Sequence, residues 1–467
     1  ASLSPNISTM GEGTFDFCSA LATVTIPEGI SSIPQFTFQD CQSLESVTLP
    51  PGIESIGEKA FSWYVLLKDI SLPESLTSIG QEAFNRCESL VFVSLPSGIQ
   101  KIEPGTFSSC YTLATIQLGP NIKEIDDHAF TLCRELTSIT LPEGITRIGI
   151  GAFTSCDELV EINLPSSIVE LGAGAFSSCD SLVSVTVPEK ITKLGPSTFD
   201  GCRDLTTIGL PEGLEEIGEQ AFRNCHDLPH LFLPPNVKRI GDQAFASCRS
   251  LTRVTFPEGL ESIGEEAFWR CSALTVVKLP DSCETLGEGA FKGCGSLYLV
   301  ELSPNMTEIP VEAFWACEEL ISVDIPFGIE TIREDAFLGC TKIAELILPE
   351  SITTMGPTAF AGCDDLLEMI IPDGVTELAL GLFARCDSLS KVHIPSSVIT
   401  VGAAVFEDCD ELKKITIPDS VQSIGADAFQ GCRKLERVDI QGAVTILPER
   451  LFDGCESLVE FQIPAGV

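Results

Sequence analysis

A phenylalanine recurs every 23 residues along the whole chain, from Phe15 and Phe38 to Phe429 and Phe452, without an insertion or a deletion. Twenty such phenylalanines span the 467 residues. A fixed period of this length is typical of a repeat protein, in which each unit buries its core only against its neighbours. We therefore expect one uninterrupted solenoid of about twenty repeats over residues 1–467, instead of the several globular domains that this length usually implies.

The residues of each repeat are numbered from its Phe as position 0. Apolar residues occupy positions 0, 6, 9, 11, 15, 18 and 22, with Cys at position 3, usually Pro at 12 and usually Gly at 19. In the repeat that begins at Phe38, residues 47–49 alternate between apolar and polar, which predicts a half-buried strand. Pro50 ends this strand because it has no N–H to donate. Ile53 and Ile56 predict a second, shorter extended segment that also faces inward.

The rest of the repeat predicts how the coil closes. Gly57 is expected to permit a sharp turn. The stretch from Glu58 to the next position 3 is too short for a stable free helix, so it predicts a single helical turn with its Ala and Phe pointing inward. The predicted fold class is an α/β repeat solenoid, with a parallel β-sheet, short second strands and single helical turns.

The consensus Leu-x-x-Val-x-Leu-Pro-x-x-Ile-x-x-Ile-Gly-x-x-Ala-Phe-x-x-Cys covers the entire chain and resembles the BspA-like leucine-rich repeat family. The resemblance implies a leucine-rich-repeat right-handed superhelix whose sheet carries the recognition surface. Members of that family are typically surface or secreted proteins of bacteria and protists that act in adhesion and binding. It therefore implies an extracellular or cell-surface location.

Composition excludes several classes of partner. The chain has 28 Lys and Arg against 67 Asp and Glu, a formal charge of −39. Such acidity argues against nucleic acid, which is bound through basic patches, and against anionic lipid surfaces. Membrane insertion is not expected either, because no apolar run approaches the roughly 18 residues that a spanning helix needs.

Cysteine usage and motif searches point away from catalysis. Nineteen of the 20 cysteines stand at position 3, Tyr64 replaces one, and Cys283 lies at position 15. Such a column predicts small, buried and reduced thiols, because identical residues on stacked coils are poorly placed to bridge. No Cys-x-x-Cys, nucleophile-elbow, phosphate-loop or zinc-protease pattern occurs, and only four histidines exist. We expect no metal site, no cofactor and no enzymatic activity.

Positions 8 and 10 flank the inward residue of the main strand and should face outward. Early repeats carry mostly Ser and Thr there, whereas later ones carry Ile347, Ile370, Lys391, His393, Lys414 and Arg437. The middle repeats carry the residues that we predict to bind a partner: His230, Phe232, Arg253, Val276, Lys278 and Leu299. The alternative is ordinary variation on a strand surface that favours β-branched and aromatic residues. Trp269 and Trp315 lie in the same stretch at another position of the repeat.

These observations predict a non-enzymatic recognition or adhesion module that binds a protein or glycan partner along its sheet. Neither end of the chain shows an atypical capping repeat, so we expect either a fragment of a longer protein or ends that meet another copy. The second case gives an alternative function, a structural filament subunit that stacks end to end. Asn6 and Asn305 lie in the two Asn-x-Ser/Thr sequons and are the predicted glycosylation sites.

Overall fold

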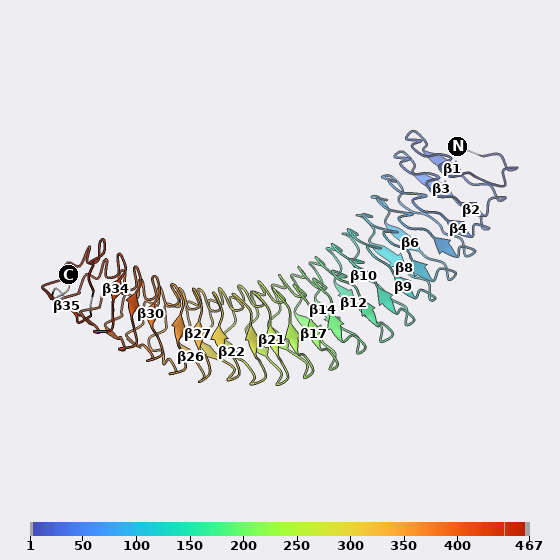
Figure 1. The fold of residues 1–467 in the computed structure, drawn as a ribbon. Coiled ribbons are helices and arrows are strands. Elements are labelled where there is room, and N and C mark those ends of the chain that lie inside the picture. The colour runs from blue at the N-terminus through green and yellow to red at the C-terminus, as the bar shows by residue number, and fades with distance from the viewer. Residues whose placement is uncertain (1–2, 443, 463–467) are drawn as a thin grey trace. The chain divides into compact units, whose positions relative to one another are not determined.

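The computed structural model describes residues 3–442 and 444–462, which form short parallel strands joined by turns. Its internal contacts divide the chain into two compact units, Ala1–Leu228 and Pro229–Val467. Within each unit the coils follow one another in chain order (Figure 1). The prediction of a parallel-strand repeat solenoid is therefore confirmed.

Most coils contribute a main strand at or near positions 8–10. In the first unit the main strands are β1 (Thr23–Thr25), β3 (Ser46–Thr48), β6 (Phe92–Ser94), β8 (Thr115–Gln117), β10 (Ser138–Ile139), β12 (Glu161–Ile162), β14 (Ser184–Thr186) and β16 (Thr207–Gly209). In the second they are β18 (His230–Phe232), β20 (Arg253–Thr255), β22 (Val276–Lys278), β24 (Leu299–Glu301), β26 (Ser322–Asp324), β29 (Glu368–Ile370), β31 (Lys391–His393), β33 (Lys414–Ile417), β35 (Arg437–Ile440) and β36 (Glu460–Gln462).

A second strand of two residues follows at positions 17 and 18 in the coils that begin at Phe15 to Phe406. In the first unit these strands are β2 (Ser32–Ile33), β4 (Ser55–Ile56), β5 (Ser78–Ile79), β7 (Lys101–Ile102), β9 (Glu124–Ile125), β11 (Arg147–Ile148), β13 (Glu170–Leu171), β15 (Lys193–Leu194) and β17 (Glu216–Ile217). In the second they are β19 (Arg239–Ile240), β21 (Ser262–Ile263), β23 (Thr285–Leu286), β25 (Glu308–Ile309), β27 (Thr331–Ile332), β28 (Thr354–Met355), β30 (Glu377–Leu378), β32 (Thr400–Val401) and β34 (Ser423–Ile424).

Each strand residue pairs with the residue 23 places further along the chain, so equivalent positions of neighbouring repeats lie side by side. Thr23 pairs with Ser46 and Val24 with Val47, and the strands run parallel. In these strands the middle residue is buried and the two outer residues are exposed. This pattern confirms that positions 8 and 10 face outward.

The core of each unit is a column of stacked aromatic rings. The centroids of Phe15 and Phe38 lie 5.2 Å apart with an interplanar angle of 3°, and those of Phe268 and Phe291 lie 5.3 Å apart at 7°. Ala at position 22, Cys at position 3 and Leu at position 6 are buried beside these rings. The Phe column is therefore the continuous core that holds successive coils together.

The prediction of a helical turn before each Cys is wrong. Lys59 and Trp63 have positive φ values of 52° and 67°, which interrupt any helical run. The Phe61 N–H donates across to the carbonyl of Ala83 in the next coil, at 2.8 Å, instead of to a residue four places earlier. The segment is a series of β-turns whose alternate N–H groups bond between coils.

The role expected for Gly57 is also corrected. Gly57 is not among the residues with positive φ; instead, a Cβ there would lie 2.5 Å from the backbone nitrogen of Gln35 in the preceding coil. At Gly287 a Cβ would lie 2.3 Å from the nitrogen of Glu265. Glycine at position 19 is therefore required by the close approach of two backbones.

Tyr64 is the one residue of the Cys column with a large side chain, and its hydroxyl is buried without a hydrogen-bond partner among the described residues. Its ring meets Phe61 edge-on at 5.7 Å. We expect Tyr64→Phe to raise the free energy of unfolding by about 1 kcal/mol, because it removes a buried polar group that is unsatisfied. Urea denaturation measures this, with Tyr298→Phe, on the exposed sheet face, as the neutral control. A destabilised Tyr64→Phe protein would show that the hydroxyl has a partner.

The main sheet is interrupted at three places inside the two units. In the first unit, residues 69–71 are joined only by an isolated bridge between Asp69 and Phe92. In the second unit, residues 345–347 are in no strand, and β31 and β33 belong to different sheets. Between the same coils the second strands β27 and β28 pair, as do β32 and β34, whereas β28 and β30 belong to different sheets.

Candidate binding surface

The six residues predicted to bind a partner come together on one face of the second unit. The pairing of β18, β20, β22 and β24 places position 8 of these coils in one row: His230, Arg253, Val276 and Leu299. Position 10 forms a second row, in which Phe232 and Lys278 lie on either side of Thr255. We call these six residues the central patch.

The members of the central patch differ in how far they are available to a ligand. Phe232 is 72% exposed, whereas Val276 and Leu299 are half-buried. Lys278 forms an ion pair with Glu301 at 2.7 Å, and this hydrogen bond raises the pKa of its ammonium group. His230 lies 3.0 Å from the hydroxyl of Thr252 through its Nδ1. Phe232 and Arg253 are thus the residues best placed to contact a partner.

A shallow pocket of about 310 Å³ opens between β20 and β22 beside the central patch. Arg253, Val276 and Lys278 line it, together with Phe256 and Glu258. The pocket wall therefore contains positively charged, negatively charged and apolar side chains. Such a mixture suits a polar side chain of a protein ligand.

Trp269 and Trp315 do not join the central patch. Both stand at position 1, in the turn that follows the core Phe, and not on the main strand. The Trp315 ring lies 3.7 Å from the ammonium group of Lys292, and the Trp269 ring lies 4.6 Å from the guanidinium group of Arg270. In these cation–π pairs each tryptophan ring packs against a cationic side chain of the protein itself.

The cysteine column is structural. All cysteines except Cys18 and Cys455 are buried, and none is in a disulfide. The Cys271 thiol donates to the Phe245 carbonyl of the preceding coil at 3.2 Å, a contact repeated along the column. Burial raises the pKa of the Cys294 thiol to about 12. Such thiols are poor nucleophiles because they remain protonated at neutral pH.

The most perturbed carboxylate belongs to a structural ion-pair network. Burial alone would raise the pKa of Asp126, but hydrogen bonds from Lys101 and Arg147 outweigh it and lower the pKa to about 2. Lys101 lies 2.8 Å from Asp126, and Arg147 also pairs with Asp127 at 2.9 Å. This network ties neighbouring coils on the second-strand side. Among the described residues, no three His, Cys, Asp or Glu side chains converge in a way that could hold a metal ion.

The two sequons lie at exposed corners. Asn6 and Asn305 are both exposed, and the Asn305 side chain donates to the Asp281 carbonyl at 2.8 Å. Glycosylation of either residue stays a prediction.

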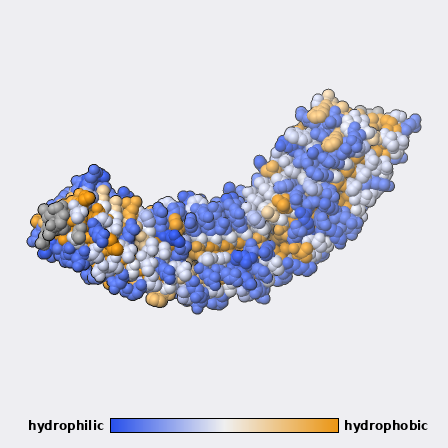
Figure 2. All heavy atoms as spheres, in the orientation of Figure 1, coloured by the Kyte–Doolittle hydropathy of each residue, from blue (hydrophilic) through white to orange (hydrophobic). Residues whose placement is uncertain are grey.

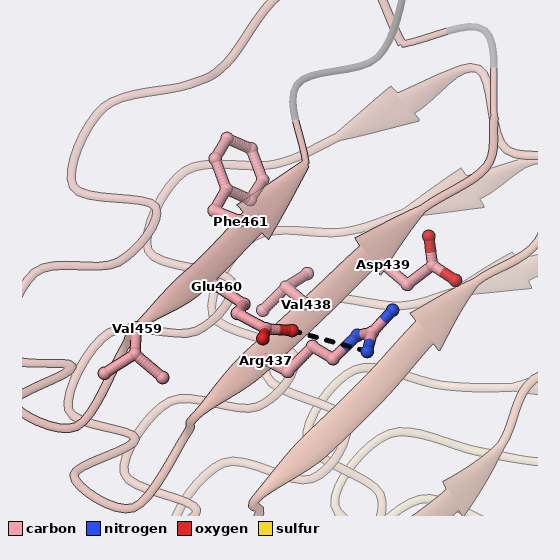
Figure 3. A pocket seen from close by; sticks show the side chains of 6 residues that line it. All are labelled: Arg437, Val438, Asp439, Val459, Glu460 and Phe461. Atoms are coloured by element: carbon pink, nitrogen blue, oxygen red, sulfur yellow. Dashed lines mark ion pairs between the residues drawn. The ribbon is translucent and has the colours of Figure 1, made fainter.

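Sequence reasoning missed the hollows that form on the sheet face of the later repeats. The smallest, of about 360 Å³, lies over β35 and β36, where Arg437 and Glu460 pair across the strands at 3.3 Å (Figure 3). Two larger ones, of about 600 and 590 Å³, lie at the two interruptions of the main sheet in the second unit. The available signal was the change from Ser and Thr to aliphatic and basic residues at positions 8 and 10.

Comparison with family models decides the relationship. The model of the BspA type leucine rich repeat region matches in six copies, over residues 1–91, 54–183, 123–252, 169–295, 262–389 and 376–467. The chain belongs to the BspA-type leucine-rich repeat family. The resemblance noted in the repeat consensus is therefore confirmed.

One solved structure agrees with this assignment, and a second is similar in sequence. A leucine-rich repeat protein from Bacteroides ovatus is 27% identical, with a TM-score of 0.58, over 75% of this chain and 87% of that one. A leucine-rich cell surface protein from Faecalibacterium prausnitzii is 25% identical, with a TM-score of 0.37, over 80% and 87% of the two chains. A search of curated protein sequences gave no match. Over the residues described, none forms a helix long and apolar enough to span a bilayer.

Proposed function

We propose that this BspA-type protein is a non-enzymatic recognition module, outside the cell or on its surface, that binds a protein or glycan partner along its main sheet. In this proposal residues 1–467 act as a single uninterrupted solenoid. The observation that carries it is the exposure of Phe232 beside Arg253, at strand positions that carry mostly Ser and Thr in the early repeats. Burying an aromatic ring and pairing an Arg are the interactions on which interface hot spots most often depend.

Several features support this proposal. The surface is mostly hydrophilic, and apolar residues reach it in separate patches (Figure 2). The sheet face is built from short rigid strands, so its side chains are preorganised and lose little entropy on binding. Arg253 lies in a strongly acidic chain, which favours an acidic group of the partner at this point.

We expect the double variant Phe232→Ser and Arg253→Thr to weaken partner binding at least tenfold while stability changes by less than about 0.5 kcal/mol, as is usual for exposed surface positions. Pull-down from a mixture of surface proteins and glycans identifies the partner, and biolayer interferometry measures its dissociation constant. The matched control is Thr23→Ser with Thr48→Ser, on the same strand face of the first unit. Unchanged binding by the double variant would contradict the assignment of the central patch.

The same protein preparations distinguish the recognition module from the alternative function, a filament subunit. Size-exclusion chromatography over a concentration series should give one constant elution volume for a monomeric recognition module. Elution that shifts to larger species with increasing concentration would instead favour end-to-end self-association.

A further inference from the structure

A second surface on the sheet face of the later repeats combines exposed aliphatic side chains with cationic ones. Its apolar half consists of Ile321, Ile347 and Ile370, and its cationic half consists of Lys413 and Lys414 together with the neighbouring His393. We call these six residues the C-terminal strip. It lies on coils that follow the central patch and shares no residue with it.

The apolar half is far more exposed than a strand surface requires. Ile347 is 86% exposed and Ile370 is 60% exposed, at position 10 of two successive coils. In the first unit the same position carries small polar residues, such as Thr25, Thr48 and Ser94. Adjacent exposed aliphatics of this kind mark an interaction site, since isolated ones would need no explanation.

The apolar half also lies at an opening in the main sheet. Within the described part of the chain, no backbone hydrogen bond joins β26 to residues 344–347, and a hollow of about 600 Å³ lies between them. Ile321 and Ile347 are both in its wall. The coils on either side stay stacked, with the Phe314 and Phe337 rings 5.5 Å apart, so the opening is a hollow on the sheet face that leaves the two isoleucine side chains accessible to a ligand.

The cationic half lies at the next opening, between β31 and β33. His393 and Lys414 line a hollow of about 590 Å³, whose rim also carries Asp373 and Asp419. Lys391, in the same coil as His393, is already paired with Glu368. In contrast, among the described residues Lys413 and Lys414 have no carboxylate within 4.0 Å. Two neighbouring unpaired lysines in a chain of charge −39 favour an anionic ligand.

We propose that the C-terminal strip binds an extended acidic peptide, a proposal that rests on the recognition function and assigns it a second site and a partner chemistry. Aliphatic side chains of the peptide pack on Ile347 and Ile370, and its carboxylates pair with Lys413 and Lys414. At about 4.8 Å per coil, the three steps from Ile347 to Lys414 span about 14 Å, the length of four or five extended residues. An anionic glycan would gain nothing from the isoleucines, which have no hydrogen-bonding group.

The test uses the full chain and a fluorescein-labelled peptide whose first half is aliphatic and whose second half consists of Asp and Glu. Fluorescence anisotropy measures its dissociation constant at low and at physiological salt. We expect Ile347→Ser with Ile370→Thr, and separately Lys413→Ser with Lys414→Thr, each to weaken binding at least tenfold. The loss of affinity caused by the lysine substitutions should be much smaller at physiological salt than at low salt, whereas the loss caused by the isoleucine substitutions should depend little on salt. The control Ser184→Glu with Thr207→Glu makes the same change in net charge on the first unit and should leave binding unchanged.

Hydrogen exchange of the complex locates the peptide independently of any variant. Protection confined to residues 321–417 supports the proposal. Protection elsewhere on the sheet overturns the C-terminal strip as the site but leaves the recognition function standing. Failure of the peptide to bind, or binding of heparin fragments alone, overturns the acidic-peptide assignment. The recognition function itself is tested separately, through the central patch and its captured partner.

Discussion

Phe245→Ala should lower the local free energy of unfolding by about 3–5 kcal/mol, the usual cost of removing a buried aromatic ring together with the cavity that it leaves. Phe245 is fully buried, and its ring stacks on that of Phe268 at 5.2 Å. Neighbouring residues cannot move in to fill this cavity, because the coils are held together by backbone hydrogen bonds such as that from the Phe245 N–H to the Ala267 carbonyl.

The damage should stay local, because each coil of a solenoid contacts only its neighbours. Hydrogen exchange with mass spectrometry measures this as loss of protection in the coils around residue 245. The matched control is Phe232→Ala, which removes the same ring from an exposed position and should leave protection nearly unchanged. Uniform loss of protection along the chain would contradict nearest-neighbour stability.

Much of the fold could be predicted from the period alone. The inward and outward sides of the main strand follow from the alternation around Val47, and the structure has that residue buried between two exposed ones. The turns could not be predicted in the same way, since Lys59 and Trp63 adopt positive φ although neither residue type favours it. What stabilises them is the hydrogen bonding between coils, which exists only after stacking.

The candidate site was predictable only in part. Position in the repeat shows that Phe232 and Lys278 face outward, but it does not show that Glu301 pairs with Lys278. The loss of strand pairing at residues 345–347 could not be predicted from the inward residues, because Leu346 and Leu348 keep the same spacing as in paired strands. Whether two neighbouring strands pair depends on small displacements between coils. The pattern of residues along the chain does not predict such displacements.

Native protein should resist thiol reagents at every cysteine except Cys18 and Cys455, whereas the denatured protein should react at all 20. Burial produces this protection in two ways. The buried thiols are out of reach of the reagent, and burial raises the pKa of those such as Cys294 and Cys386 to about 12. At pH 8 a thiol with that pKa is ionised in roughly one molecule in ten thousand, and only the thiolate reacts.

The raised thiol pKa also makes stability depend on alkaline pH. The unfolded chain ionises its thiols near the ordinary value of 9.0, while the folded chain keeps Cys294 protonated up to about 12. Proton release then favours the unfolded state, so the stabilising contribution is complete below pH 9 and is lost as the pH rises from 9 to 12. In that window each such thiol lowers the free energy of unfolding by about 1.4 kcal/mol per pH unit.

Intact-mass spectrometry after treatment with iodoacetamide, with and without guanidinium, measures the number of modified thiols directly. The variant Cys18→Ser with Cys455→Ser is the control: its native form should take up no label, and its denatured form should lose only two labels relative to the parent. A protein that takes up no label when denatured without a reductant, but gains mass on reduction and is then labelled, would contain disulfides, and the column of buried thiols would then be wrong. Rapid labelling of the native protein at the core positions would instead mean that the coils separate readily, which is incompatible with the thiol hydrogen bonds from each coil to the preceding Phe carbonyl.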